Sequence, residues 1–196
     1  MNAVPRTRSS GQPDASAPRV PNGVIAVTLI VIAETMLFAG LISAHVQFVS
    51  DQVGAFWPPL DQPPLPVAET AVGSMALLLS GCALLWARLS FRAASRRAAT
   101  FLLTALVLGA GYLGFQGIEW IGLIRDGLDL STAYGAFFYL IVGLHSLHTA
   151  GALVWLARVW TRLRQGVLTP GGFMAAQVFW YFAVLIWPVI YFQVYR

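Results

Sequence analysis

The stretch that decides the fold runs from Ala133 to Ala157 and reads AYGAFFYLIVGLHSLHTAGALVWLA. It contains no Asp, Glu, Lys or Arg and is long enough to cross the hydrocarbon core of a bilayer as a helix. Two histidines, His145 and His148, lie about one helical turn apart near its centre. Ionisable residues at such a depth are costly and usually mark a functional site. These histidines are therefore the first candidates for one.

The composition of the whole chain indicates the same class of protein. Of its 196 residues, 58% are hydrophobic and only 10% are charged, and the mean hydropathy is +0.71. A soluble domain of this composition would precipitate, so we expect an integral membrane protein. All 12 basic residues are arginines, and they cluster beside the apolar segments. They do not form a stripe that follows a phosphate backbone, which argues against nucleic-acid binding.

Five segments have the length and the apolar character of membrane spans, and helices satisfy their backbone hydrogen bonds where open strands would not. The sequence therefore predicts an all-α fold, a polytopic bundle of five transmembrane helices within residues 23–196. Residues 1–22 are rich in Pro, Ser, Ala and Arg, and we expect a flexible cytoplasmic arm there. The predicted spans are residues 23–49, 67–87, 99–124, 131–157 and 174–195.

The arginines also predict the orientation of the chain. Ten of the 12 precede the first span or follow the second and fourth spans, whereas Arg125 and Arg196 lie on the other side with several aspartates. The positive-inside rule then puts the N-terminus in the cytoplasm and the C-terminus outside. The proline-rich connection from Phe56 to Pro66 cannot be helical, and we expect it to form a stiff cap at the external interface.

Glutamates lie within the spans or at their edges, at Glu34, Glu69 and Glu119, and each needs a partner or a neutral form. Glu34 and His45 are eleven positions apart, so they mark one polar face with about 16 Å between them along the helix. Glu69 lies at the start of the second span, where a structural role at the helix end is the simpler interpretation.

The third span carries a polar face of its own. Tyr112, Gln116 and Glu119 recur at positions i, i+4 and i+7, so we expect this face to point into protein. For His145 and His148, hydrogen bonding to a glutamate across helices is the favoured interpretation. Metal ligation by these histidines would need three or four donors, which no local motif supplies. A proton relay through the glutamates is not favoured, because it would need titratable groups at closer spacing.

Several short motifs occur in a fixed order along the chain. They are AETMLFAG at 33–40, FWPP at 56–59, PLPVAET at 64–70, GFQGIEW at 114–120, GAFF at 135–138 and GLHSLH at 143–148. This order resembles subunit III of haem-copper terminal oxidases, the cytochrome c oxidase subunit 3 family, over residues 24–195. The five predicted spans correspond to a short form of that subunit.

The resemblance implies roles for individual residues. Glu34 matches the characteristic intramembrane carboxylate of the family, and Glu119, His145 and His148 match later family positions. Where the last helix of the family often carries a His and an Asp, this chain has Tyr181 and Val184 and so departs from the family pattern. The long form of the subunit has seven helices and a lipid-filled cleft, which in a five-helix form is incomplete or completed by another subunit.

The resemblance also implies a function. The chain would be a non-catalytic subunit that stabilises the catalytic subunit, supports proton uptake and binds phospholipid, with subunits I and II as partners in a bacterial inner membrane and possible membership of a larger respiratory supercomplex. Haem and copper would lie in the partners, since this chain has three histidines and one cysteine. The electron donor, cytochrome c or quinol, stays open. The alternatives are a five-helix accessory protein of a nitric oxide reductase and, from another class, a small transporter.

Overall fold

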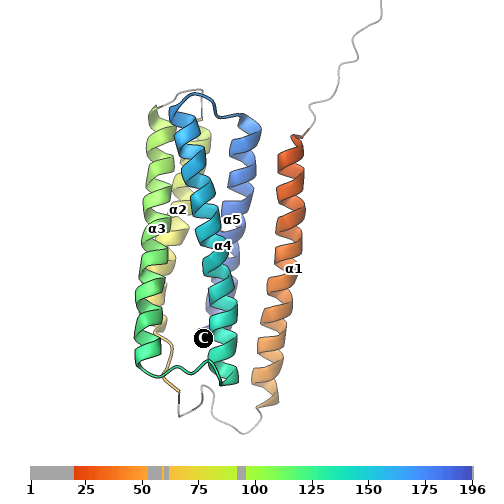
Figure 1. The fold of residues 1–196 in the computed structure, drawn as a ribbon, viewed down its shortest axis with the longest axis vertical. Coiled ribbons are helices and arrows are strands. Elements are labelled where there is room, and N and C mark those ends of the chain that lie inside the picture. The colour runs from red at the N-terminus through yellow and green to blue at the C-terminus, as the bar shows by residue number, and fades with distance from the viewer. Residues whose placement is uncertain (1–19, 53–58, 60–61, 92–95, 196) are drawn as a thin grey trace, which may run out of the picture.

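The computed structural model describes residues 20–52, 59, 62–91 and 96–195. These residues form five helices, each long and apolar enough to cross a membrane, which confirms the predicted all-α fold (Figure 1). At 1.5 Å per residue, helices of 23 to 32 residues exceed the ~30 Å hydrocarbon core, so their ends reach the headgroup region. The helices are α1 (Asn22–Asp51), α2 (Val67–Leu89), α3 (Arg96–Arg125), α4 (Ala133–Arg164) and α5 (Pro170–Val194).

Two of the sequence predictions concern segments at or beyond the edge of this description. The arm predicted for residues 1–22 lies outside the described residues up to position 19, and α1 already begins at Asn22. Most of the predicted cap also lies outside them. Its described part, Pro59 together with the run from Gln62 to Pro66, is not helical.

Local sequence signals explain where the helices begin and end. Thr132 and Thr169 are N-caps, and each side chain accepts a hydrogen bond from a backbone N–H three residues later, at 3.1 Å in both cases. Pro170 occupies the first turn of α5, where no N–H is needed. After α3 and α4, Gly127 and Gly166 adopt positive φ angles of 89° and 72°. This conformation favours glycine and ends both helices.

The connection between α3 and α4 is held by its own polar groups. Ser131 donates two hydrogen bonds to the Asp129 carboxylate, one from its hydroxyl at 2.6 Å and one from its backbone N–H at 2.8 Å. These hydrogen bonds hold the pKa of the exposed Asp129 carboxyl below its ordinary value. The connection therefore presents a fixed negative charge beside the ends of α3 and α4.

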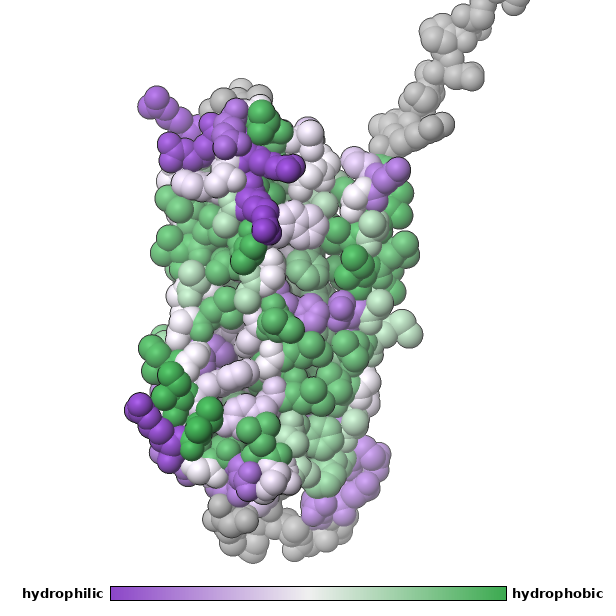
Figure 2. Space-filling view, in the orientation of Figure 1, coloured by the Kyte–Doolittle hydropathy of each residue, from purple (hydrophilic) through white to green (hydrophobic). Residues whose placement is uncertain are grey.

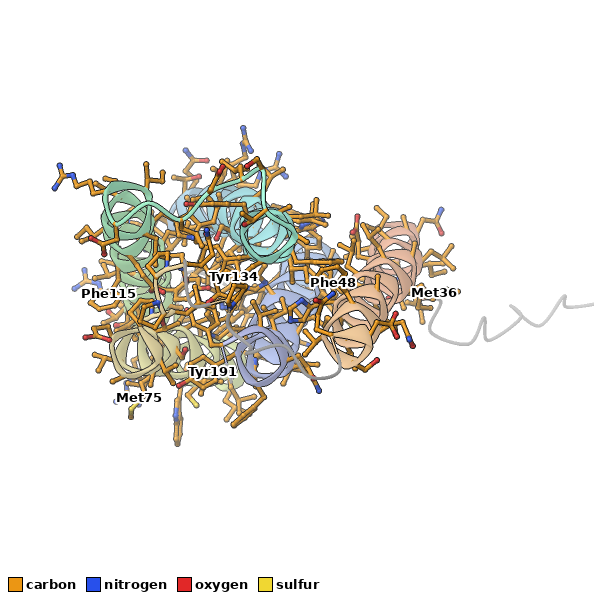
Figure 3. All side chains as sticks on the ribbon, turned by 90° about the horizontal axis from the view of Figure 1, so that it is seen from below. Met36, Phe48, Met75, Phe115, Tyr134 and Tyr191 are labelled. Carbon is orange, nitrogen blue, oxygen red and sulfur yellow. The ribbon has the colours of Figure 1, made fainter. Side chains whose placement is uncertain are left out.

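Helices α2 to α5 form an antiparallel bundle, and α1 lies beside it (Figure 1). Helix α3 packs against α2 and α4, and α5 packs against α4 and α2, so the four helices close a ring. Within the described residues, α1 packs on α5 and α4 and has no contact with α2 or α3. Seen along the helices, Met36 of α1 and Met75 of α2 lie at the periphery of the molecule (Figure 3).

The interior of the bundle is aromatic and closely packed. Trp180 and Trp187 of α5 are fully buried, as is Tyr112 of α3. A side chain on Gly109 of α3 would collide with Trp180, because an added Cβ would lie 2.5 Å from the Cη2 atom of its ring. The absence of a Cβ at this position therefore lets the Trp180 ring lie against α3.

Polar side chains tie the bundle together at several depths. The Trp187 Nε1 group donates to Ser74 Oγ at 2.7 Å, which joins α5 to α2. Ser80 Oγ donates to the carbonyl oxygen of Ala105 at 2.8 Å, which joins α2 to α3. Such interhelical hydrogen bonds contribute more specificity than energy in a membrane, typically about 1 kcal/mol or less each.

The surface agrees with a membrane environment. On the face that Figure 2 shows, hydrophobic side chains cover most of the middle of the molecule, apart from small hydrophilic patches, and hydrophilic side chains gather at its two ends. Met36, Ile118 and Leu147 are exposed over 72%, 71% and 69% of their surface, which suits contact with lipid or with apolar partner helices. The end where α2 and α4 finish, here called the arginine-rich end, carries the described arginines Arg88, Arg96, Arg97, Arg158, Arg162 and Arg164.

Candidate functional site

The structure brings Glu34 of α1 and His148 of α4 together. His148 Nε2 lies 3.1 Å from Glu34 Oε2, an ion-pair distance without hydrogen-bond alignment. The other ring nitrogen, Nδ1, lies 2.7 Å from the carbonyl oxygen of Leu144, so Nδ1 carries a proton and donates to it. The Glu34 side chain is 25% exposed and the His148 side chain is 13% exposed. The sequence predicts a hydrogen bond between a histidine of this span and a glutamate on another helix; the structure brings His148 and Glu34 together at an ion-pair distance but does not align them as a hydrogen bond.

Phe38 completes the contact between α1 and α4. It lies one helical turn after Glu34 and is fully buried. Its ring meets the rings of His148 and His145 in edge-on geometry, with centroids 5.7 and 6.4 Å apart. An acidic and an aromatic residue on one face of α1 thus contact both histidines of α4.

His145 occupies a different environment from His148, although only three positions separate them. It is fully buried, and its ring stacks on Trp187 with centroids 4.8 Å apart. Tyr112 meets the same imidazole edge-on at 6.1 Å. The Nε2 atom of His145 lies 3.2 Å from the hydroxyl of Thr149. His145 is therefore part of the aromatic core, and the two histidines do not converge on one ligand.

A second polar group lies near the other end of the bundle, opposite the arginine-rich end. Thr70 of α2 donates to Glu119 Oε1 of α3 at 2.6 Å. Gln116, one turn before Glu119, donates from Nε2 to the Tyr195 hydroxyl at 3.2 Å. The polar face predicted on the third span is indeed buried, since Tyr112, Gln116 and Glu119 are 1%, 3% and 9% exposed. It connects α3 to α2 and to the end of α5.

Glu69 and His45 lie near that same end. Glu69 is exposed in the first turn of α2, where the helix dipole favours a negative charge. His45 is buried beside Phe137 of α4, with ring centroids 5.3 Å apart, and its imidazole hydrogen-bonds to the backbone of Gln193. The predicted polar face of α1 therefore meets α4 at Glu34 and both α4 and α5 at His45.

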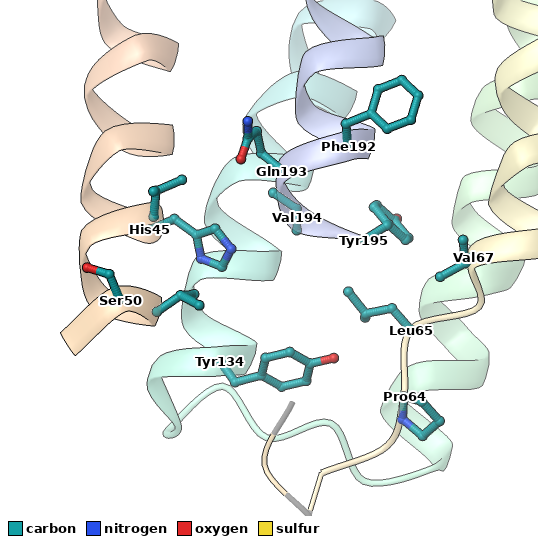
Figure 4. A pocket seen from close by; sticks show the side chains of 12 residues that line it. His45, Ser50, Pro64, Leu65, Val67, Tyr134, Phe192, Gln193, Val194 and Tyr195 are labelled. Carbon is teal, nitrogen blue, oxygen red and sulfur yellow. The ribbon is translucent and has the colours of Figure 1, made fainter. Parts of the chain in front are cut away.

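A cavity of about 650 Å³ opens between α1, α4, α5 and the segment that precedes α2 (Figure 4). His45 and Tyr134 line it, and the Tyr134 hydroxyl hydrogen-bonds to the backbone of Leu65. The remaining lining is largely aliphatic and includes Val46, Val49 and Val194. The cavity separates the end of α1 from the start of α2.

Trp187, a structural residue of this region, gave no signal in the sequence. Trp187 of α5 contacts three other helices, through His145 of α4, Tyr112 of α3 and Ser74 of α2. From the sequence alone, however, it resembles any interfacial tryptophan. Thr70 and Ser74 lie one turn apart on α2 and do mark a polar face. This spacing is the clue in the sequence to the α2 partners of two hydrogen bonds, Thr70 with Glu119 and Ser74 with Trp187.

Metal binding finds no support in this geometry. Within the parts of the chain that the structure describes, no three His, Cys, Asp or Glu side chains are grouped so that they could hold a metal ion. Glu34 and His148 form one pair, His145 lies among aromatic rings, and Glu119 lies with Thr70.

Comparison of the sequence with known proteins identifies the family of this chain. Residues 14–196 match the family of cytochrome c oxidase subunit III. The chain belongs to this family. The resemblance of its motifs to subunit III is thereby confirmed.

Three relatives show the range of the similarity. Cytochrome c oxidase subunit 3 of Marchantia polymorpha is 32% identical over 86% of this chain and 66% of the relative. Cytochrome bo(3) ubiquinol oxidase subunit 3 of Pseudomonas aeruginosa is 28% identical over 89% and 84%. Probable cytochrome c oxidase subunit 3 of Nocardia farcinica is 30% identical over 89% and 88%. The chain spans just under two thirds of the Marchantia relative.

The structure also shows what replaces the subunit III histidine and aspartate in the last helix. The Tyr181 hydroxyl donates to the carbonyl oxygen of Gly81 on α2 at 3.4 Å. Val184 packs on the same glycine, where an added Cβ would lie 3.1 Å from Val184 Cγ1. In this chain the two positions therefore serve the contact between α5 and α2.

Proposed function

We propose that this chain is the non-catalytic third subunit of a haem-copper terminal oxidase, and that it stabilises the catalytic subunit by packing against it. The family match over residues 14–196 carries this proposal. Redox centres would belong to partner subunits I and II, because the chain offers three histidines and one cysteine. The names of the relatives include both a cytochrome c oxidase and a ubiquinol oxidase, so the electron donor stays open between them.

The charge distribution supports an orientation in the membrane. Six described arginines lie at the end where α2 and α4 finish, and the positive-inside rule assigns that end to the cytoplasm. The N-terminus is then cytoplasmic and the C-terminus external. Relatives from Pseudomonas aeruginosa and Nocardia farcinica support a bacterial inner membrane as the location.

The proposed contribution of Glu34 and His148 is to fasten α1 to α4. The carboxyl and the imidazole are close enough to exchange a proton, at 3.1 Å, and both are partly exposed on the membrane-facing surface. A pair of this kind suits a subunit that supports proton uptake by its neighbour and contacts lipid. The pair alone does not span the bilayer, so it is not a complete proton path.

The first experiment is a gentle detergent extraction with an affinity tag on this chain. We expect the eluate to contain a haem protein with a reduced-minus-oxidised spectrum and to consume oxygen. Haem with reduction of nitric oxide in place of oxygen would favour the alternative accessory role. An eluate without haem would contradict the oxidase proposal and favour the transporter.

Substituting Glu34 tests its role in the assembly. We expect Glu34→Leu to lower the stability of the chain by about 1 kcal/mol and to reduce the haem protein recovered with it, because His148 loses its partner. Glu34→Gln keeps the shape and removes the charge, so its loss should be smaller. The readouts are the thermal unfolding midpoint in detergent and the haem yield of the purification.

Thr35→Val is the matched control, since Thr35 is exposed on α1 and bonds only to the carbonyl of Val31 in its own helix. It should behave as wild type. If Glu34→Leu left the haem yield and the turnover unchanged, the proposal that the Glu34 carboxylate fastens α1 to α4 would be contradicted.

A further inference from the structure

Two polar atoms inside the bundle, one on α3 and one on α4, lack a hydrogen-bond partner among the described residues. They are the hydroxyl oxygen of Tyr112 and the Nδ1 atom of His145, and both are enclosed by protein. Tyr112 is 1% exposed and His145 is 0% exposed. A buried polar group without a partner is destabilising, and such groups are rare in native proteins. Each of the two atoms therefore needs a partner other than a described side chain.

The contacts of His145 show which of its ring nitrogens carries the proton. The Thr149 hydroxyl donates to the backbone carbonyl oxygen of His145 at 2.9 Å. The same hydroxyl lies 3.2 Å from His145 Nε2. A hydroxyl has only one hydrogen to donate, so the second contact is a hydrogen bond only when Nε2 donates to the Thr149 oxygen. In a neutral imidazole with its proton on Nε2, the Nδ1 atom is an acceptor.

Tyr112 offers the donor that Nδ1 needs. The two rings are neighbours that meet edge-on, with centroids 6.1 Å apart, yet the Tyr112 hydroxyl and His145 Nδ1 form no direct hydrogen bond. A small molecule that accepts from a phenol and donates to an imidazole nitrogen would satisfy both atoms. Water has both capacities, and a buried water molecule typically bonds to about two to four polar groups of this kind.

The surroundings of these two atoms are aromatic, which limits what can lie there. Trp187 stacks on the imidazole with centroids 4.8 Å apart and meets Tyr112 at 5.2 Å. Phe38 meets the imidazole edge-on at 6.4 Å, from the side of α1. These rings carry no formal charge, so an ion between them would lack a neighbouring counter-charge. A small neutral molecule fits this environment better than an ion does.

We propose that one buried water molecule bridges Tyr112 and His145, accepting a hydrogen bond from the Tyr112 hydroxyl and donating one to His145 Nδ1. The bridge ties α3 to α4 in the middle of the bundle. Near the arginine-rich end, the same helices are joined directly, because Trp160 Nε1 donates to the carbonyl oxygen of Ala99 at 3.1 Å. The water site uses only residues of this chain and does not depend on the proposed function.

Removing the Tyr112 hydroxyl distinguishes a bridged group from an unsatisfied one. If water bridges the two residues, Tyr112→Phe loses a hydrogen bond and leaves Nδ1 with a poorer partner. We then expect the thermal unfolding midpoint of the full chain in detergent to fall by about 2–4 °C. If the hydroxyl were unsatisfied, its removal would leave the midpoint unchanged or raise it. Either of those results would overturn the proposal.

A second measurement observes the water itself. An electron cryomicroscopy map of the assembly purified through a tag on this chain, at a resolution that shows ordered water, should contain a peak between the two side chains. We expect this peak within about 3.2 Å of both the Tyr112 hydroxyl oxygen and His145 Nδ1. It should be missing from the map of Tyr112→Phe.

Tyr191→Phe is the matched control, because the Tyr191 hydroxyl donates directly to the carbonyl oxygen of Val67 at 2.9 Å. This variant also loses one tyrosine hydroxyl of α5, but the water peak beside His145 should remain. A wild-type map without the peak would contradict the bridge. So would a peak that persists in Tyr112→Phe, since the water would then not depend on the phenol hydroxyl.

Discussion

Alanine in place of Gly109 is expected to destabilise the protein by about 1–3 kcal/mol, the usual range for overpacking a well-filled core. The added Cβ would lie 2.5 Å from Cη2 and 2.8 Å from Cζ2 of Trp180. That ring is fully buried and belongs to α5, so it can move only if α5 shifts away from α3. The measurement is the thermal unfolding midpoint of the purified chain in detergent, alone and with its partners.

Gly111→Ala is the matched control, because it makes the same chemical change two positions later on the same helix. An added Cβ at Gly111 would meet no atom within 4 Å. Alanine is the better helix former by up to about 1 kcal/mol, so this variant should be neutral or slightly more stable. Equal losses in both variants would show that helix propensity, and not the close approach of Trp180, governs these positions.

Trp187→Ala is expected to have the largest effect of any single substitution considered, about 3–5 kcal/mol. The indole is fully buried and stacks on His145, while Tyr112 meets it edge-on with centroids 5.2 Å apart. Its removal leaves a cavity at the centre of the bundle and also removes the hydrogen bond to Ser74. We expect a lower unfolding midpoint and a lower yield of assembled protein.

Trp187→Phe separates packing from hydrogen bonding, since it keeps an aromatic ring but cannot donate to Ser74. Its loss should be clearly smaller than that of the alanine variant. Trp86→Ala is the control for loss of a tryptophan in general, because Trp86 is 56% exposed on α2. A full-size loss in Trp86→Ala, or none in Trp187→Ala, would contradict the central role of Trp187.

Much of the architecture was predictable from the sequence, because the relevant physics is local. A bilayer demands apolar segments of a minimum length, so five such segments predict five helices without knowledge of how they pack. The spacing of Tyr112, Gln116 and Glu119 likewise predicts a buried face, since helical periodicity depends on the chain alone. The family motifs between Ala33 and His148 were recognisable for a related reason, as they are short runs with fixed internal spacing.

The partners of these residues were decided by the tertiary structure. Periodicity says which side chains share a face but not which helix covers it, and lipid and protein are similarly apolar neighbours. The sequence therefore treats His145 and His148 alike, whereas the packed bundle surrounds one with aromatic rings and sets the other against Glu34. The position of α1 beside α5 and α4 depends on contacts between residues distant in the chain, such as Phe38 with both histidines. Whether a segment spans the membrane depends on that segment alone, whereas a contact between helices depends on two segments that are distant in the sequence.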